Sequence, residues 1–570
     1  MKKTFLLSCL MLAAMPVMAA YTGHVYVDKN KNGVFDQSEK PLAGIKVSDG
    51  LNVVETAADG SFTLPGHERE RFIFITTPSG YKTFNRHYHK IEKKQSGYDF
   101  GLIPYSGRIR KDGSHRYIHI ADTEIFNTEN HADWVNNVRD YARNEQAAFI
   151  IHTGDICYEK GLKAHIKLMN TENMDCPVFY CIGNHDLVKG KYGEELFESI
   201  YGPVYYSFDA GNVHYVVTPM PGGDHAPGYT SDDVCRWLKN DLAHIRPGTP
   251  VVVFNHDLLT YEDTFIFKSK NAGSINLNEY NLKAWVYGHW HINYMKKQGD
   301  VYSVCTSSLD KGGIDHSTTA FRVMHVDSKG DFTSELRYTY LDKNICIASP
   351  AGVMASGVLP VAVNVYSSVS PVREVLYTCL ADGKPVLKNK RLLQSTDWSW
   401  NGELPLSHKY VGKELTLRVT ARFNNGEIAE AESNFICRTE KAVPLFSADW
   451  DNLSGNAKHS APVSAPLNLP LQLAWTNNVG ANLYMTSPLI HKGKVIVASV
   501  DEDLKGVGHV YVLNGKDGTI LWSCPVRNSI KNSIAVDSDI VFAQDAQGFL
   551  YAIDTETGKL CWEKQLPVNG

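Results

Sequence analysis

The chain has 570 residues, of which 43% are hydrophobic and 21% charged, and its formal net charge is −5. This composition is ordinary for a globular protein, and the length is typical of about four domains. The net negative charge and the lack of a long basic run argue against a nucleic-acid-binding surface. No stretch beyond the N-terminal region reaches the ~18 apolar residues of a transmembrane helix.

The first twenty residues have the pattern of a secretory signal peptide. Two lysines precede an apolar stretch from Phe5 to Met15, and small residues lead up to Ala20. We therefore expect a signal peptide over residues 1–20 and a periplasmic or secreted mature protein. Export permits disulfides, but the cysteines are irregularly spaced, which favours mostly buried free thiols.

Residues 21–106 have the pattern of an all-β domain, with short alternating runs such as 24–27 and 72–75 between glycine-containing turns. One loop in this region matches the spacing of a calcium-binding loop, with Gly33 at the sharp turn. Its candidate ligands are Asp28, Asn30, Asn32, Val34 through its backbone carbonyl, Asp36 and Glu39. The alternative is a polar turn rich in Asn and Asp. Because a strand precedes it, the loop resembles those of bacterial surface β-domains.

Between residues 107 and 340 the pattern changes to alternating strands and helices. Residues 117–121 and 149–152 are predicted strands, and 131–144 is a predicted helix between them. The helix has one apolar face, formed by Trp134, Val135, Val138, Tyr141 and Ala142. This β-α-β order predicts a mostly parallel sheet between helices, in an α/β sandwich.

Five clusters of metal-ligand residue types follow five strand-like runs in this region. The clusters are Asp122 with Glu124, Asp155, Asn184 with His185, His256, and His289 with His291. Loops at the carboxyl ends of parallel strands converge on one site, so these side chains are expected to meet. Carboxylates, one amide and several imidazoles suit two adjacent divalent metal ions.

The ordered set D-x-x, GD, GNHD, NH and GHxH resembles the calcineurin-like metallophosphoesterase superfamily. The resemblance implies that Asp155 bridges two metals. It also implies that the first metal is held by Asp122, His291 and the residue at 124, and the second by Asn184, His256 and His289. A phosphoester substrate would then be attacked by a hydroxide bound to both metals. His185 is not assigned to a metal and is the candidate general acid for the leaving group.

The sequence departs from the superfamily pattern at two points. Glu124 stands where the superfamily commonly has histidine, so three carboxylates would place −3 against the +4 of the two metals. More oxygen and less imidazole favours Mn²⁺, Mg²⁺ or Fe over Zn²⁺ without deciding between them. Tyr158 stands where some members have a carboxylate that orients the catalytic histidine, which leaves the partner of His185 open.

Other polar residues in this region have weaker signals. His225 lies in the Gly- and Pro-rich loop 221–228, and we consider it, with Tyr158, a candidate for substrate contact. The alternative for that loop is a solvated surface turn. His119, His152 and His214 lie inside apolar runs and are predicted to be packed core histidines.

Residues 341–440 return to β-alternation and are predicted to form a β-sandwich-like domain. From 441 to 570 a 40-residue period relates Tyr511, Gly518 and Trp522 to Tyr551, Gly558 and Trp562. This resembles the propeller repeats of pyrroloquinoline-quinone enzymes, where Trp and Gly join neighbouring blades. We predict a partial β-propeller without bound quinone. Two or three blades cannot close a ring, so either the chain is incomplete or the blades cover another surface.

The leading hypothesis is an exported metal-dependent phosphoesterase acting on a phosphomonoester or phosphodiester. The alternative is a catalytically degenerate surface protein that binds glycan or protein through its β-domains. Glu124 keeps this alternative open, whereas His185, His289 and His291 count against it. Under either hypothesis residues 441–570 are a candidate contact for protein or glycan. The superfamily acts on many phosphoesters with one metal core, so the substrate stays open.

Overall fold

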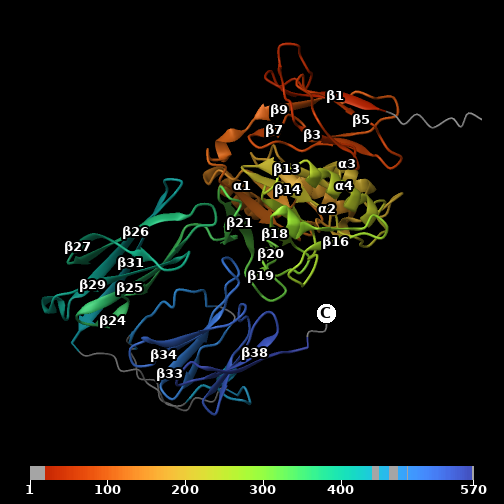
Figure 1. The fold of residues 1–570 in the computed structure, drawn as a ribbon. Helices are drawn as coiled ribbons and strands as arrows, with labels where there is room; N and C mark the ends of the chain where they lie inside the picture. The colour runs from red at the N-terminus through yellow and green to blue at the C-terminus, as the bar shows by residue number, and fades with distance from the viewer. Residues whose placement is uncertain (1–19, 440–448, 461–470, 472, 484–485, 568–570) are drawn as a thin grey trace, which may run out of the picture.

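The computed structural model describes residues 20–439, 449–460, 471, 473–483 and 486–567. Within these residues the chain is multidomain and mostly β, with four α-helices (Figure 1). The helices are α1 (Ala132–Asn144), α2 (Tyr158–Leu168), α3 (Glu195–Tyr201) and α4 (Ser231–Ala243), with 3-10 turns η1 (Ser106–Arg108), η2 (Asn184–Asp186), η3 (Leu277–Tyr280), η4 (His408–Tyr410) and η5 (Leu453–Gly455). No helix in the described part of the chain has the length and apolarity to cross a membrane. The predicted signal peptide lies outside the described residues, apart from Ala20.

Two small sheets form the N-terminal part of the chain. Their strands are β1 (Tyr21–Val27), β2 (Lys40–Pro41), β3 (Lys46–Ser48), β4 (Val53–Glu55), β5 (Ser61–Leu64), β6 (Phe72–Ile75), β7 (Tyr81–Thr83), β8 (Tyr88–Lys90) and β9 (Phe100–Pro104). One sheet has the order β2-β1-β9-β7 with β5 paired to β1, and the other β4-β3-β6-β8. Alternate residues of β1 and β5 point into a shared apolar core, as the alternating sequence pattern predicts.

The predicted calcium loop follows β1 and folds back on itself. Both oxygens of Asp28 accept backbone N–H groups, from Asn32 at 3.2 Å and Gly33 at 2.9 Å. The side-chain amides of Asn30 and Asn32 both donate to Asp36 Oδ2, at 2.7 and 3.1 Å. Glu39 accepts from the N–H of Lys29 and Asp36, whereas the side chain of Val34 is 60% exposed. The candidate oxygens therefore face one compact turn, and calcium binding there stays a prediction.

The central part of the chain contains two sheets that pack face to face. The first has the order β12-β11-β10-β21-β22 and the second β13-β14-β15-β18-β20-β19. Their strands are β10 (His115–Ile120), β11 (Phe149–His152), β12 (Val178–Tyr180), β13 (Tyr206–Ala210), β14 (Val213–Val217), β15 (Val251–Phe254), β18 (Leu282–Tyr287), β19 (Tyr294–Gln298), β20 (Val301–Cys305), β21 (Ala320–Val326) and β22 (Phe332–Tyr338), with a separate hairpin of β16 (Ile266–Lys268) and β17 (Ser274–Asn276). Strands β10 to β12 run parallel, as do β14, β15, β18 and β20.

Helices cover the outer faces of these two sheets. The apolar face of α1 is the predicted one, because its buried residues are Trp134, Val135, Val138, Tyr141 and Ala142. This face packs on Ile118 and Ile150 of β10 and β11, and Trp237 of α4 packs on the second sheet. The order of layers is helix, sheet, sheet, helix, which leaves the carboxyl ends of the parallel strands free to carry loops.

Nine strands follow and form a two-sheet unit with its own core. They are β23 (Asn344–Ser349), β24 (Gly352–Ala355), β25 (Val358–Tyr366), β26 (Val372–Ala381), β27 (Lys384–Arg391), β28 (Leu393–Gln394), β29 (Ser399–Pro405), β30 (Glu414–Phe423) and β31 (Ile428–Arg438). The sheet orders are β23-β25-β29-β28 and β24-β31-β30-β26-β27. Alternating residues of β25 and β30 are buried between the two sheets, which is the arrangement of a β-sandwich.

The C-terminal repeats form two four-stranded antiparallel sheets. The first contains β32 (Leu489–His491), β33 (Lys494–Ala498), β34 (His509–Asn514) and β35 (Ile520–Pro525), and the second β36 (Ala535–Asp537), β37 (Ile540–Gln544), β38 (Phe549–Asp554) and β39 (Leu560–Gln565). The repeated Trp and Gly make the same contact twice. Trp475 Nε1 donates to Gly515 O at 2.9 Å and its ring lies over Gly518, while Trp522 Nε1 donates to Thr555 O at 3.1 Å and its ring lies over Gly558.

All ten cysteines in the described residues are free, and eight of them are buried. The prediction of mostly buried free thiols is confirmed for this part of the chain.

Candidate metal centre

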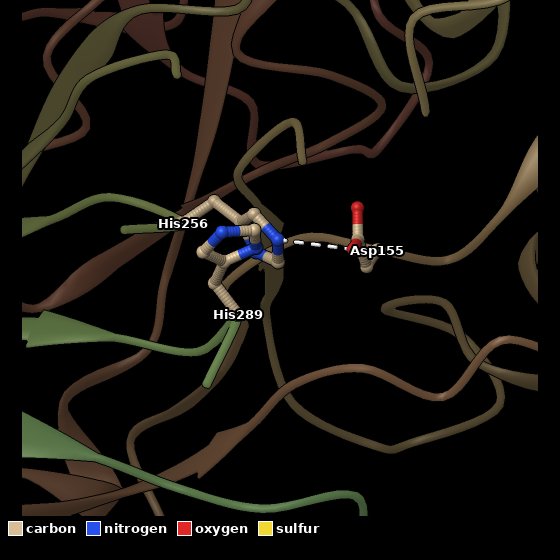
Figure 2. Close-up of side chains that lie close together, drawn as sticks. All are labelled: Asp155, His256 and His289. Atoms are coloured by element: carbon tan, nitrogen blue, oxygen red, sulfur yellow. Dashed lines mark ion pairs between the residues drawn. The ribbon is translucent and has the colours of Figure 1, made fainter. Parts of the chain in front are cut away.

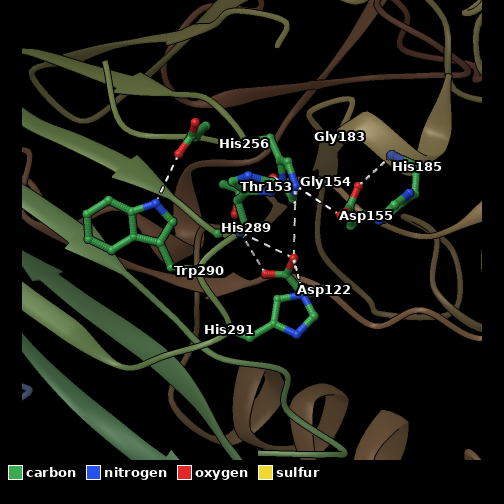
Figure 3. A network of polar contacts seen from close by, with 12 residues as sticks. Asp122, Thr153, Gly154, Asp155, Gly183, His185, His256, His289, Trp290 and His291 are labelled. Atoms are coloured by element: carbon green, nitrogen blue, oxygen red, sulfur yellow. Dashed lines mark hydrogen bonds and ion pairs between the residues drawn. The ribbon is translucent and has the colours of Figure 1, made fainter. Parts of the chain in front are cut away.

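The predicted ligand clusters lie at one end of the central domain, where the strands of both sheets end (Figure 3). Asp122 and Glu124 follow β10, Asp155 follows β11, Asn184 and His185 form part of η2 after β12, His256 follows β15, and His289 and His291 follow β18. The two sheets pack face to face, and their parallel strands all point towards this end. Residues separated by up to 169 positions in the sequence are therefore neighbours in space.

Two groups of ligand atoms share Asp155. The first group is Asp122, Asp155 and His291, and the second is Asp155, His256 and His289. Within each group the ligand atoms lie within 4.8 Å of one another, and Figure 2 shows the second group with both imidazoles facing the carboxylate. A carboxylate common to two such groups is suited to bridge two cations.

The distances place Glu124 with the first group. His291 Nε2 lies 3.3 Å from Asp122 Oδ1 and 3.5 Å from Glu124 Oε1. In the second group, His256 Nε2 lies 3.1 Å from Asp155 Oδ2. Cys157 also lies near Glu124 and Asp155, but burial followed by the charge of Asp155 raises the pKa of its thiol.

Asn184 Oδ1 is buried at the site and has no hydrogen-bond partner within the described residues. His256 Nδ1 lies 2.7 Å from the carbonyl of Thr153 and donates to it, so Nε2, 3.1 Å from Asp155 Oδ2, is the nitrogen that a metal ion would bind in place of a proton. A buried acceptor without a donor is costly unless a cation occupies it. The residues present therefore fit a metal ion.

The electrostatics of the site also call for positive charge. Asp122 and Asp155 are 0% and 2% exposed. Burial lowers the pKa of His256, but the attraction of Asp155, and then of Asp122, outweighs it and raises the pKa to about 9. Burial raises the pKa of Asp122 despite its contact with His291. A metal cation bound in place of the proton on the imidazole would neutralise the charge of these buried carboxylates.

The backbone at the site is strained in a consistent way. Five of the candidate ligands have left-handed φ angles: Asp122 (52°), Glu124 (45°), Asp155 (56°), His289 (65°) and His291 (50°). Two glycines allow the loops to approach. Gly154 has φ 101°, and a Cβ there would lie 2.7 Å from His256 Nδ1, while a Cβ on Gly183 would lie 2.2 Å from Asp155 Oδ1. Such strain is typical of functional sites, where the fold holds side chains in one geometry.

Asp186 connects the loop of Asp155 to the loop of Asn184, a structural role that the sequence did not predict. It is fully buried, and its oxygens accept the N–H groups of Asp155, Cys157 and Gly183, each at 2.9 Å. Burial, followed by the charge of Asp155, raises its pKa to about 7. Its place in the Gly-Asn-His-Asp motif was the available signal.

Glu124, which replaces the usual histidine, contacts a lysine that the sequence did not indicate. Lys311 Nζ lies 3.2 Å from Glu124 Oε2 and also donates to the backbone carbonyls of Thr123 and Glu124, each at 3.1 Å. Lys311 is 187 residues away in the sequence. Its charge offsets the extra carboxylate, so the net charge around the first group is close to that of a site with a neutral histidine.

His185 stands next to the two groups and has a carboxylate partner. Its Nδ1 lies 2.8 Å from Asp224 Oδ2, and its backbone N–H donates to Asp155 Oδ1 at 3.0 Å. Burial lowers the pKa of His185, but the hydrogen bond to Asp224 and the charge of Asp155 outweigh it and raise the pKa. Asp224 lies in the loop 221–228, beside the exposed His225. Asp224 is thus the carboxylate partner of His185 that the sequence left open.

An exposed aromatic pair borders His185. Tyr158, which is 44% exposed, stacks on Phe126, which is 58% exposed, with ring centroids 6.5 Å apart. The ring of Tyr158 is 5.4 Å from that of His185. The backbone of Tyr158 has a left-handed φ of 56°, so it is strained at the residue whose ring is exposed to solvent. The structure places Tyr158 at the edge of the site, whereas no contact of the His225 side chain is established.

The three histidines predicted to lie in the core are buried. His119 and His152 are 0% exposed and bond to Thr153 and Thr123. His214 is 1% exposed, but it is held between Asp209 at 2.7 Å and Asp241 at 2.8 Å. Burial lowers its pKa, but the charge of Asp241 and the hydrogen bonds from both carboxylates raise it to about 9.

Comparison with known families agrees with this geometry. Residues 115–293 match the family described as Calcineurin-like phosphoesterase. Residues 29–104 match the N-terminal domain of calcineurin-like phosphoesterases, and residues 472–569 match the repeats described as Outer membrane protein assembly factor BamB. The resemblances predicted from the motifs are confirmed.

One curated relative supports the same assignment. Purple acid phosphatase 13 of Arabidopsis thaliana is 26% identical over 215 residues, which cover 35% of this chain and 36% of the relative. This chain thus spans about a third of that relative's length.

Solved structures give only distant matches. A predicted phosphoesterase from Streptococcus pneumoniae TIGR4 is 10% identical over 40% of this chain and 98% of its own, with a TM-score of 0.19. BamB from Moraxella catarrhalis is 12% identical over 43% and 58%, with a TM-score of 0.13. TM-scores this low support no conclusion about fold.

Proposed function

We propose that the protein is an exported phosphoesterase that hydrolyses a phosphomonoester or phosphodiester at a dinuclear metal centre. The observation that carries the proposal is the pair of ligand groups that share Asp155. We assign Asp122, Glu124 and His291 to one metal, Asn184, His256 and His289 to the other, and Asp155 to both. Two divalent cations bound there would clamp phosphate oxygens and lower the pKa of a water molecule towards neutrality.

His185 supplies a proton to the departing alcohol in this proposal. Its Nδ1 faces Asp224, so Nε2 is the atom available to the substrate. Asp224 keeps the ring oriented and favours the protonated form, which a general acid needs at neutral pH. Tyr158 and Phe126 are the residues next to the leaving group and would pack against it. His225 remains a candidate for substrate contact from the same loop as Asp224.

The test is hydrolysis of p-nitrophenyl phosphate and its bis-ester by the full chain, with metal analysis of the same sample. We expect activity that a chelator abolishes and that Mn²⁺, Fe, Zn²⁺ or Mg²⁺ restores, with two metal equivalents per chain. If the metal-loaded chain cleaved no monoester or diester, the alternative of a degenerate binding protein would be favoured. Lys311 weakens that alternative, because it compensates for Glu124.

Three further assignments complete the proposal. The sequence of residues 1–20 supports export. The residues of loop 28–39 support a calcium site, which isothermal titration of the full chain with Ca²⁺ would test. The two C-terminal sheets and their repeated Trp–Gly contacts support blades of a partial propeller. No quinone is expected there, and contact with protein or glycan through residues 441–570 stays a prediction.

A further inference from the structure

The C-terminal repeats contact the central domain at β19 and β21, and Figure 1 shows them beside β19. Asn528 Nδ2 donates to the carbonyl of Met295 in β19 at 3.1 Å. From the other side, the fully buried Arg322 of β21 donates to the carbonyl of Glu502 at 2.8 Å. Hydrogen bonds to backbone carbonyls in both directions fix the position of the repeats on this surface.

Lys531 brings a buried positive charge into the same contact. Its side chain is 11% exposed. Nζ donates to the carbonyl of Asn293 at 2.6 Å and to Asp315 Oδ2 at 2.8 Å, and it forms an ion pair with Glu502. An ammonium group has three donors, and all three have partners here. Asn293 is two residues beyond His291, so Lys531 connects the repeats to the segment that carries a candidate metal ligand.

Asp315 belongs to a loop that supports His291 directly. The backbone N–H of Ile314 donates to the carbonyl of His291 at 2.9 Å. Gly313 lies against the same carbonyl, since a Cβ there would be 2.9 Å from it. His291 has a left-handed φ of 50°, a conformation that a non-glycine residue keeps only when its surroundings hold it. The loop 310–317 is part of those surroundings, and Lys531 holds the loop.

We propose that Lys531 is a positioning residue of the metal centre, and that the repeats are therefore a structural part of that centre. By holding Asp315 and the carbonyl of Asn293, Lys531 keeps His291 in the conformation in which Nε2 faces Asp122. The inference rests on the proposed function only in taking His291 as a metal ligand. It gives the repeats a role on this chain, as the support of the loop behind His291.

The test is a metal titration of the full-length Lys531→Met variant. Mutation of a residue that orients a metal ligand typically changes metal affinity 10- to 100-fold. Lys531 does not contact His291 directly but acts through Asn293 and Asp315. We therefore expect about 10-fold weaker binding of one of the two metal equivalents, followed by Mn²⁺ titration with electron paramagnetic resonance. Lys531→Arg should restore most of the affinity. Arg527→Met is the matched control, because Arg527 pairs with Glu563 within the repeats and should leave metal affinity unchanged.

Unchanged metal affinity in Lys531→Met, or an equal loss in Arg527→Met, would overturn the inference. If Lys531→Met does not fold, Asp315→Asn is the second variant, since it removes the charge partner from the loop side. Unchanged affinity in Asp315→Asn would then overturn it. A wild-type chain that binds two metals but cleaves no phosphoester overturns the proposed function alone, and a wild-type chain that binds no metal overturns both.

Discussion

Replacing Asp224 or His185 tests whether this pair protonates the leaving group. The side chains of His185 and Asp224 are 34% and 38% exposed at a separation of 2.8 Å. An ion pair at that exposure contributes up to about 1 kcal/mol, which corresponds to about a 5-fold change in rate. We therefore expect Asp224→Asn to lower kcat by about 5-fold. His185→Ala removes the acid itself and should lower kcat by about 10²- to 10⁴-fold.

The assay compares two aryl phosphates whose leaving groups differ in pKa. Phenol has a pKa of about 10 and needs a proton as it departs, whereas p-nitrophenolate is a far weaker base and departs without one. Both variants should therefore lose activity on phenyl phosphate and stay near the wild type on p-nitrophenyl phosphate. Asp224→Glu is the control, since it keeps a carboxylate in the loop. An equal loss on both substrates would refute the role of His185 as a general acid.

Three other changes address the metal centre and the stability of the domain. Asp155→Asn should abolish binding of both metals, because the carboxylate is shared by the two ligand groups. Asp257 follows His256 and accepts from Trp290 Nε1 at 3.1 Å but belongs to neither group, so Asp257→Asn should keep both metals; metal analysis after gel filtration decides this. Glu124→His should shift metal preference from Mn²⁺ towards Zn²⁺ in competition experiments, and an unchanged preference would show that Glu124 does not ligate. The folded pKa of His214 is about 9, above its ordinary value of 6.5, so its stabilisation is complete below about pH 6.5 and lost as the pH rises through 9. Between pH 6.5 and 9 the contribution of His214 to the free energy of unfolding falls by about 3 kcal/mol. Urea unfolding across this range should show the fall, and a wild-type slope in Asp241→Asn would contradict the assignment.

The sequence predicted that the candidate ligands lie together because each of them follows a strand. In a parallel sheet the carboxyl ends of the strands lie at one edge, so Asp122 after β10 lies near Asp155 after β11. β15 belongs to the second sheet, and His256 reaches the same site because the two sheets pack face to face with their parallel strands ending at the same end. Asp122 and His256 are 134 positions apart, yet their side chains come within 4.0 Å. The apolar face of α1 was also predicted correctly, because the spacing of its apolar residues at 3.6 residues per turn is a local property of the sequence.

The partners of these ligands could not be predicted in the same way. Asp224 and Lys311 lie in irregular loops that have no periodic pattern, and their contacts depend on how each loop folds back on the site. His214 was predicted to pack in the core, and it is buried there, but its charge comes from a carboxylate on α4 that only the packing of the helix brings near. Local patterns fix where strands end, whereas loop contacts depend on the assembled fold.

The same distinction explains why the repeats gave so little functional signal. Their Trp and Gly positions encode packing contacts within the repeats, Trp475 on Gly518 and Trp522 on Gly558, and these contacts do not depend on the surface that the sheets cover. Lys531 is the residue that ties them to His291, and it lies in the connection between β35 and β36, outside the repeated pattern. Burying a cation costs desolvation free energy, and here its three acceptors come from three segments of the chain, which fixes their relative position. The geometry it fixes here is that of the loop behind His291.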